Sequence, residues 1–180
     1  MNTKRNAKKH IIVGIVVLLM SAIPILCNMY LGKPALNISE MIENEDINDL
    51  SLTIYYLSPY TDMFMAITGV EDLCQRSEKI VISGSDLEEH IDVFGQIGKD
   101  ALKPVLWKSW DMNSLRIYYV LESKKKGRLF DVAMWGARND SMIVSGYEAK
   151  ANNVFIEAII PFLPEDKAET LENFLIYGFR

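Results

Sequence analysis

Residues 115–135, LRIYYVLESKKKGRLFDVAMW, decide the fold. Two runs rich in β-branched and aromatic residues, 115–122 and 128–135, flank the linker SKKKG, and such runs are typical of strands. Gly127, the last residue of the linker, can adopt the positive φ that a short hairpin loop needs. The stretch therefore predicts an antiparallel hairpin with a basic tip.

Shorter strands are predicted on either side of this hairpin. Residues 52–57 (LTIYYL) and 79–83 (KIVIS) have strand composition, and another strand is expected at 142–144 (MIV). The chain then turns at residues 145–146, and the sequence leaves open whether 147–149 continue as a strand.

Helix start signals lie between and after these strands. Thr68 with Glu71 has the spacing of a capping box, as has Ser85 with Glu88. The second box predicts a helix that runs from Ser85 to about Leu102, before a proline. Its buried face would consist of Leu87, Ile91, Phe94 and Ile97.

Two further helices are predicted near the C-terminus. An apolar run at 153–160 reads as a buried helix capped by Asn152 or Asn153. The last helix would begin with Pro164 near its first position and end at Gly178.

This order of elements predicts an α+β fold. Hairpins cannot supply the crossovers of a parallel sheet, so we expect one mostly antiparallel sheet of four to five strands with helices packed on one face. About 130 residues without a linker or repeat are the size of one domain.

The N-terminal region predicts a membrane anchor. Residues 11–32 carry no charge, and a helix of this length at about 1.5 Å per residue spans a bilayer's hydrocarbon core. Four bases and no acid precede the span, so the positive-inside bias places the N-terminus in the cytoplasm. We expect a basic cytoplasmic stub (1–10), a transmembrane signal anchor (11–32), an acidic juxtamembrane connector (33–50) and an extracytoplasmic domain (51–180), hence a single-pass protein of the cell membrane.

A cleaved signal peptide is the alternative, because exported proteins also begin with a basic stretch followed by an apolar one. Cleavage needs two small residues at defined positions, and Ala22, Gly32 and Ala35 each lack the second one. Cys27 follows Leu26 rather than the small residue of a lipoprotein signal. The sequence therefore favours an uncleaved anchor.

Charge and cysteine content exclude several classes of protein. The formal net charge is −5, but all 24 acids and only 15 of the 19 bases lie in residues 33–180. That region therefore carries −9, which disfavours nucleic acid as a partner. With Cys27 in the predicted span, Cys74 is the only thiol of the outer domain, so no disulfide can form within it.

Catalytic and metal-binding patterns are scarce. His90 is the only histidine of the outer domain, which excludes a His-pair zinc site, and the sequence has no nucleophile elbow, Walker loop or dinucleotide fingerprint. We therefore expect no cofactor and no metal. Paired carboxylates would suffice for glycoside cleavage; the acids available are Asp86, Glu88, Glu89, Asp92, Asp111 and Asp131.

Two clusters are candidate binding sites. One gathers positive charge at the hairpin tip of an otherwise acidic domain, where it could meet lipid headgroups, an anionic wall polymer or an acidic protein face. The other is an aromatic pair before the hairpin that could present a platform to a sugar or a peptide. Their residues are Lys124, Lys125, Lys126 and Arg128 at the tip, and Trp107 and Trp110 in the pair.

Three segments carry a resemblance to a known group of proteins. Residues 84–92 (GSDLEEHID), 130–136 (FDVAMWG) and 159–166 (IIPFLPED) resemble segments of small signal-anchored envelope proteins from gut-dwelling Gram-positive bacteria. That group has no established activity, so the resemblance implies an envelope location and no functional residue.

The sequence favours a membrane-anchored extracytoplasmic binding domain without catalytic activity, whose partner is an envelope protein or a cell-wall component. A carboxylate-dependent hydrolase of envelope carbohydrate is the first alternative. A sensor or inhibitory subunit of a membrane complex, acting through its membrane helix, is the second.

Overall fold

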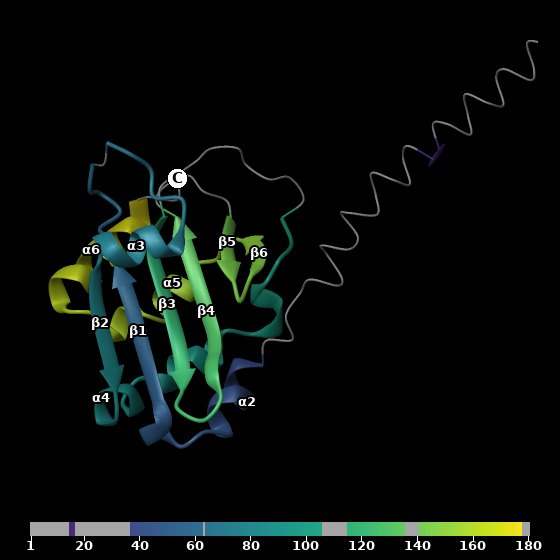
Figure 1. Ribbon diagram of the computed structural model, residues 1–180, viewed down its shortest axis with the longest axis vertical. Helices are drawn as coiled ribbons and strands as arrows, with labels where there is room; N and C mark the ends of the chain where they lie inside the picture. The colour runs from purple at the N-terminus through teal and green to yellow at the C-terminus, as the bar shows by residue number, and fades with distance from the viewer. Residues whose placement is uncertain (1–14, 17–36, 63, 106–114, 136–140, 178–180) are drawn as a thin grey trace, which may run out of the picture. The chain divides into compact units, whose positions relative to one another are not determined.

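The computed structural model describes residues 15–16, 37–62, 64–105, 115–135 and 141–177. From Asn37 on, they form a compact α+β unit around one antiparallel sheet with the strand order β2-β1-β3-β4-β5-β6 (Figure 1). This confirms the predicted α+β class and antiparallel sheet. The strands are β1 (Leu50–Tyr56), β2 (Glu78–Ser83), β3 (Leu115–Ser123), β4 (Gly127–Trp135), β5 (Ser141–Val144) and β6 (Tyr147–Lys150).

The sheet has six strands because two tight turns reverse the chain. Gly127, with φ 74°, closes the central β3–β4 hairpin, as its position in the sequence predicted. Ser145 and Gly146 both have positive φ, 48° and 79°, which is the requirement of a two-residue type I′ hairpin turn. Residues 147–150 therefore return as a separate strand, so the expected count of four to five was too low.

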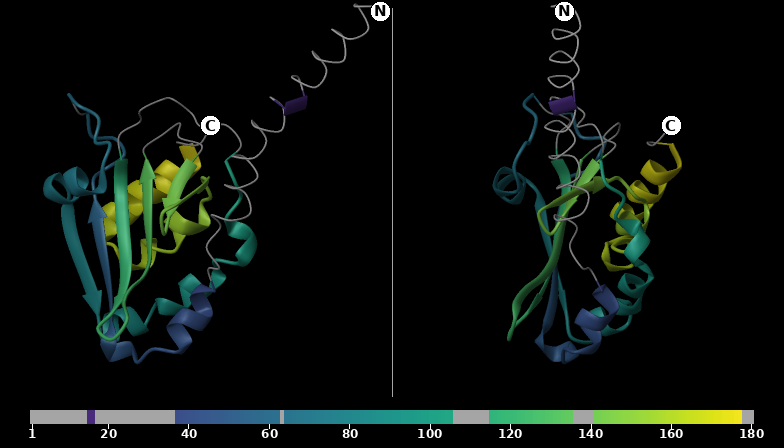
Figure 2. Two further views of the ribbon diagram at one scale, coloured as in Figure 1. Left: turned by 45° about the vertical axis from the view of Figure 1, so that its right-hand side comes forward. Right: turned by 90° about the vertical axis from the view of Figure 1, so that its right-hand side faces the viewer.

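Helices cover both faces of the sheet, whereas the sequence predicted one face only (Figure 2). Successive strand residues point to opposite faces, so β3 gives Tyr119 to the main core and Tyr118 to a smaller cluster beneath α3 (Val70–Arg76). The elements on the main face are α2 (Ile38–Glu43), α4 (Ser85–Glu88), η2 (Ile91–Gln96), α5 (Val154–Glu157), η4 (Ile160–Phe162) and α6 (Glu165–Tyr177).

The prediction of one long helix from Ser85 to about Leu102 is wrong. This stretch instead forms the single turn α4, the 3-10 helix η2 and a further 3-10 turn, η3 (Lys99–Ala101), with His90 at φ −128° between the first two. Ile91, Phe94 and Ile97 are nevertheless all buried. Their spacing of three matches the 3-10 helix, in which residues i and i+3 lie above one another.

Both predicted capping boxes are also wrong, because each helix has a glycine as its N-cap. α3 starts after Gly69, so that Glu71 falls one position too early to bond back. α4 starts after Gly84, whose φ of 63° and ψ of −137° suit a residue without a Cβ. Neither helix has a side-chain cap.

The apolar run at 153–160 forms two short helices, α5 and η4, in place of one. Of the two proposed caps, Asn153 occupies the N-cap position of α5 but makes no side-chain cap hydrogen bond, while Asn152 Oδ1 accepts a hydrogen bond from the Val154 amide at 3.2 Å. Beyond it, α6 starts at Glu165 directly after Pro164, close to the predicted start.

The acidic stretch before β1 packs onto the domain from Ile38 onward. Ile38 is buried in the main core, and Ile42 and Ile47 contact the same core. Gly95 in η2 permits a close approach by α2, because a Cβ at this position would lie 3.3 Å from Ser39 Oγ.

Among the residues that the structure describes, no helix has both the length and the apolar character that a membrane crossing requires. The predicted span 11–32 lies outside them except for Ile15 and Val16, which are helical. The membrane anchor therefore stays a prediction.

Aromatic rings join the main-face elements to the sheet. Phe94 of η2 is fully buried, with its ring centroid 5.5 Å from that of Phe130, 5.7 Å from that of Phe162 and 6.2 Å from that of Tyr119. The Tyr119 hydroxyl also donates a hydrogen bond of 3.0 Å to the backbone oxygen of Phe155. One buried cluster thus holds η2, η4 and α5 against the middle of the sheet.

Phe94→Ala should lower the free energy of unfolding by about 3–5 kcal/mol, the usual cost of emptying a buried phenylalanine site. Gln96→Ala, at an exposed position of the same 3-10 helix, should change it by less than about 0.5 kcal/mol. Urea denaturation of the purified proteins measures both values. Similar losses in the two variants would contradict the role assigned to the ring cluster.

Candidate functional site

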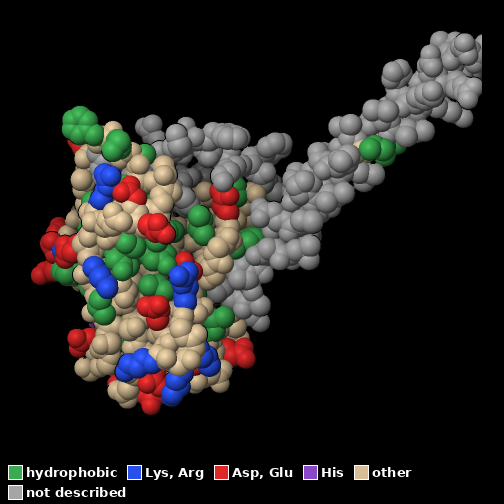
Figure 3. Space-filling model, in the orientation of Figure 1, with side chains coloured by type: hydrophobic (Ala, Val, Ile, Leu, Met, Phe, Trp, Pro, Cys, Tyr) green, Lys and Arg blue, Asp and Glu red, His purple; other side chains and the backbone are tan. Residues whose placement is uncertain are grey.

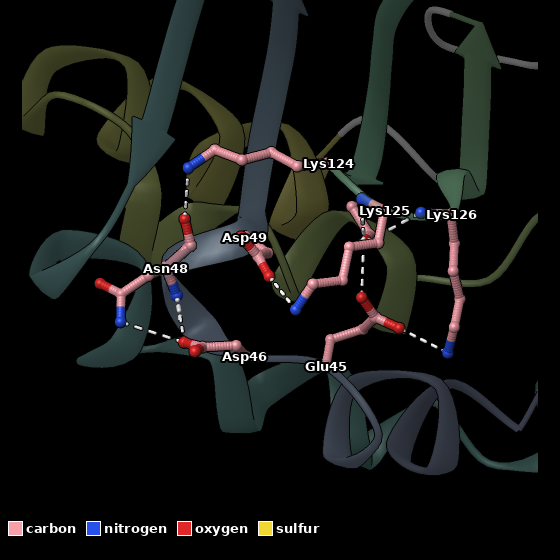
Figure 4. A network of polar contacts seen from close by, with 8 residues as sticks. Glu45, Asp46, Asn48, Asp49, Lys124, Lys125 and Lys126 are labelled. Carbon is pink, nitrogen blue, oxygen red and sulfur yellow. Dashed lines mark hydrogen bonds and ion pairs between the residues drawn. The ribbon is translucent and has the colours of Figure 1, made fainter.

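The predicted basic tip binds an acidic segment of this same chain. Figure 4 shows the lysines of the β3–β4 turn above residues 45–49, which precede β1. Lys125 Nζ lies 2.5 Å from Asp49 Oδ2, and Lys126 Nζ lies 2.5 Å from Glu45 Oε1. Lys124 donates twice, from Nζ to the backbone oxygen of Asn48 at 2.7 Å and from its amide to that of Asp49 at 2.9 Å.

Glu45 is the centre of this network. Its side chain is only 2% exposed, and its carboxylate accepts hydrogen bonds from Lys126 and from the Ser123 hydroxyl. These two groups hold the pKa of Glu45 below its usual range. In the neighbouring ion pair, the hydrogen bond to Asp49 raises the pKa of Lys125.

The positive charge of the tip is therefore largely neutralised within the chain. Lys125, Lys126 and Arg128 remain 69%, 56% and 61% exposed, and Arg128 lies 3.7 Å from Asp131. An anionic partner at the tip would have to compete with Glu45 and Asp49 for these bases.

The other predicted site residues are scattered. Trp107, Trp110 and Asp111 lie outside the described residues. Asp86, Glu89 and His90 line one hollow, where the His90 ring packs edge-on against Phe162 at 5.8 Å. Within the described ranges, no group of three His, Cys, Asp or Glu side chains could hold a metal ion.

The structure reveals a candidate that sequence reasoning missed, the outer edge of β2. β2 and β6 are the two outermost strands. Beside β6, Pro104 forms a bridge with Ala149, and the Lys150 amide donates to the backbone oxygen of Lys103 at 2.7 Å. Among the described residues no such segment covers β2, whose backbone pairs with β1 alone.

Along its centre β2 also lacks the usual protection of an edge strand, since its two charged residues, Glu78 and Lys79, lie at its start. Its centre is the uncharged run Ile80-Val81-Ile82, it has no bulge in its register with β1, and Val81 is 58% exposed. Proteins usually block exposed edges with charges, prolines, bulges or a covering segment. The sequence shows the composition of this strand but not its outermost place in the sheet.

Two hollows lie beside β2 on the main-helix side. One, of about 310 Å³, is lined by residues 80–82 of β2, by Asp86, Glu89 and His90, and by residues 161–164 before α6. The other, of about 380 Å³, lies between the end of β1, Glu78 and the first turns of α6. Together with the strand, the first of these hollows forms what we call the β2 groove. In the view from the α3 side, hydrophobic side chains lie between charged ones along the sheet (Figure 3).

Comparison with known proteins found no matching family model, no matching curated protein and no matching solved structure.

Glu45→Gln should lower the free energy of unfolding at neutral pH and change it little at acidic pH. Because the folded state lowers the pKa of Glu45, its contribution is fully present above its unfolded pKa of about 4.3 and is lost as pH falls through the folded pKa. We therefore expect the urea midpoints of wild type and variant to differ at pH 7 and to converge at lower pH.

Glu43→Gln is the matched control, since Glu43 is exposed and lies two residues away. It should follow the wild-type midpoint at every pH. A gap between wild type and Glu45→Gln that stays constant down to acid pH would show that the Glu45 carboxylate is not held by charge at the tip.

Proposed function

We propose that this protein is a non-enzymatic binding module that adds an extended segment of a partner protein to its sheet as a further strand beside β2. The observation that carries the proposal is the difference between the two edges. The backbone groups of β6 meet residues 103–104, whereas in the described structure those on the outer side of β2 have no partner. Strand addition would supply the missing hydrogen bonds.

The β2 groove favours a particular kind of segment. Alternate side chains of an added strand would point to the main-helix side, where residues 80–82 and 161–164 line the hollow with apolar side chains. Two carboxylates, Asp86 and Glu89, line the same hollow, and no lysine or arginine does. An apolar segment with flanking lysines or arginines would match both features.

A second copy of the chain fits the edge less well. Antiparallel pairing of two β2 strands would place Glu78 of one copy opposite Ser83 of the other, close to its Asp86. Like charges brought together in this way oppose association. The segment of a different protein is therefore the favoured occupant.

We further propose that residues 11–32 anchor the module in the cell membrane with residues 33–180 outside. The charge-free span and the bases that precede it support this topology. The partner would then be another protein of the cell envelope, which meets the module at the outer surface of the membrane.

Val81→Lys should abolish binding without unfolding the domain. Val81 lies at the centre of β2 and is 58% exposed, and a lysine on an edge strand both hinders pairing and repels a basic segment. A random dodecapeptide library, selected on full-length protein in lipid nanodiscs, supplies the probe. We expect enriched peptides with alternate apolar residues and basic ends, which bind Val81→Lys at least about tenfold more weakly.

Val81→Thr is the matched control, because it keeps a β-branched strand former at the same place and should bind like wild type. Hydrogen exchange should slow at residues 79–82 when peptide is bound. Failure to enrich any peptide over empty nanodiscs, equal binding by Val81→Lys, or protection confined to another part of the chain would each refute strand addition.

A further inference from the structure

The hollow at the start of β2 has a polar lining that strand addition does not use. It lies where Tyr56, the last residue of β1, pairs with Glu78. The N-terminal turns of α6 close its other side. The lining residues are Tyr56, Leu57, Ser58, Glu78, Asp166, Lys167 and Thr170, and the cavity volume is about 380 Å³.

The Tyr56 hydroxyl in this lining lies beside the hydroxyls of Ser58 and Thr170, but among the described residues it makes no hydrogen bond of ordinary geometry. Tyr56 is only 6% exposed, and its oxygen is buried. Burial raises the pKa of this phenol, and the neighbouring hydroxyls of Ser58 and Thr170 partly oppose the shift. Because buried polar groups are nearly always bonded, an unsatisfied hydroxyl in the lining of a cavity indicates a ligand group that would complete it.

The charges in the lining select an uncharged ligand. Lys167 Nζ lies 3.2 Å from Glu78 Oε2 and 3.6 Å from Asp166 Oδ2, and its side chain is 16% exposed. An anion would meet the two carboxylates, and a cation would meet the ammonium group. A neutral molecule with many donors and acceptors could instead donate to the carboxylates and accept from Lys167.

An exposed aromatic ring lies beside the hollow. Tyr60 is 58% exposed, and its ring packs edge-on against Phe174, with centroids 6.3 Å apart. Phe174 follows Thr170 by one turn of α6, so Tyr60 lies next to the side of the hollow that Thr170 lines. Its free ring surface could receive the apolar face of a flat or ring-shaped ligand.

We propose that this hollow binds a neutral saccharide. A sugar ring has a hydroxyl on most of its carbon atoms, which suits the charged and hydroxyl groups of the lining, and its apolar C–H face suits the apolar part of the lining and the Tyr60 ring. A lipid chain has no polar groups and would leave the charged side chains of the lining unpaired. The Tyr56 hydroxyl, Glu78 and Lys167 bind the sugar hydroxyls, while Tyr60 packs against the ring. The site is separate from the added strand and does not depend on it.

Saccharide titrations of the full-length protein test this site. Lipid nanodiscs are needed because common detergents carry sugar headgroups that would compete. The probes are cellotriose, maltotriose and tri-N-acetylchitotriose, with adenosine and inorganic phosphate as comparators, and saturation-transfer NMR and calorimetry measure binding. We expect at least one trisaccharide to bind with a Kd below about 1 mM, and neither comparator to bind as tightly.

Two variants and two controls locate the site. Tyr56→Phe removes only the unpaired hydroxyl and should weaken binding about fivefold, while Tyr60→Ala should weaken it about tenfold. Tyr55→Phe is the matched control, since Tyr55 belongs to the cluster on the opposite face of the sheet, and it should bind like wild type. Val81→Lys should also keep saccharide binding, which separates this site from the proposed strand addition.

Binding of none of the three trisaccharides at about 10 mM would overturn the proposal. Tighter binding of adenosine or phosphate would also overturn it. The same holds if a trisaccharide binds Tyr56→Phe and Tyr60→Ala as tightly as wild type, because the site would then lie elsewhere.

Discussion

The buried contact of the Phe94 ring with Phe130 and Tyr119 is the interaction on which the rest of the domain depends. The elements that cover the main face are mostly single turns, such as α4 and α5 with four residues each. Helices this short have no stability of their own in water. They persist because their apolar side chains are buried against the sheet, so the sheet and its aromatic centre organise the covering layer.

The order of strands decides which edges of the sheet are outermost. β6 is outermost on one side and is covered by residues 103–104, while β2 is outermost on the other side and is open in the described structure. The basic tip of the hairpin, residues 124–128, is instead engaged by Glu45 and Asp49. The proposed binding edge therefore rests on the accessibility of backbone groups and not on local charge.

Local composition was sufficient to predict most strands, but it could not predict the contacts between distant segments. The β3–β4 hairpin follows from its β-branched and aromatic runs and from Gly127, which needs no tertiary information. The prediction of a helix at 85–102 failed because a spacing of three between Ile91, Phe94 and Ile97 also suits one face of an α-helix. Only packing against the rest of the domain selects the 3-10 form. The pairing of Lys126 with Glu45 joins residues about eighty positions apart, and no local pattern reveals it.

The basic tip also determines how the domain responds to mechanical load. Residues 45–49 are held to the turn between β3 and β4 by two ion pairs and by two hydrogen bonds from Lys124. Tension applied to the chain from its N-terminal side reaches these contacts before it reaches β1. They lie one after another at residues 45, 48 and 49, so they must break in turn before the tension can pull β1 from the sheet.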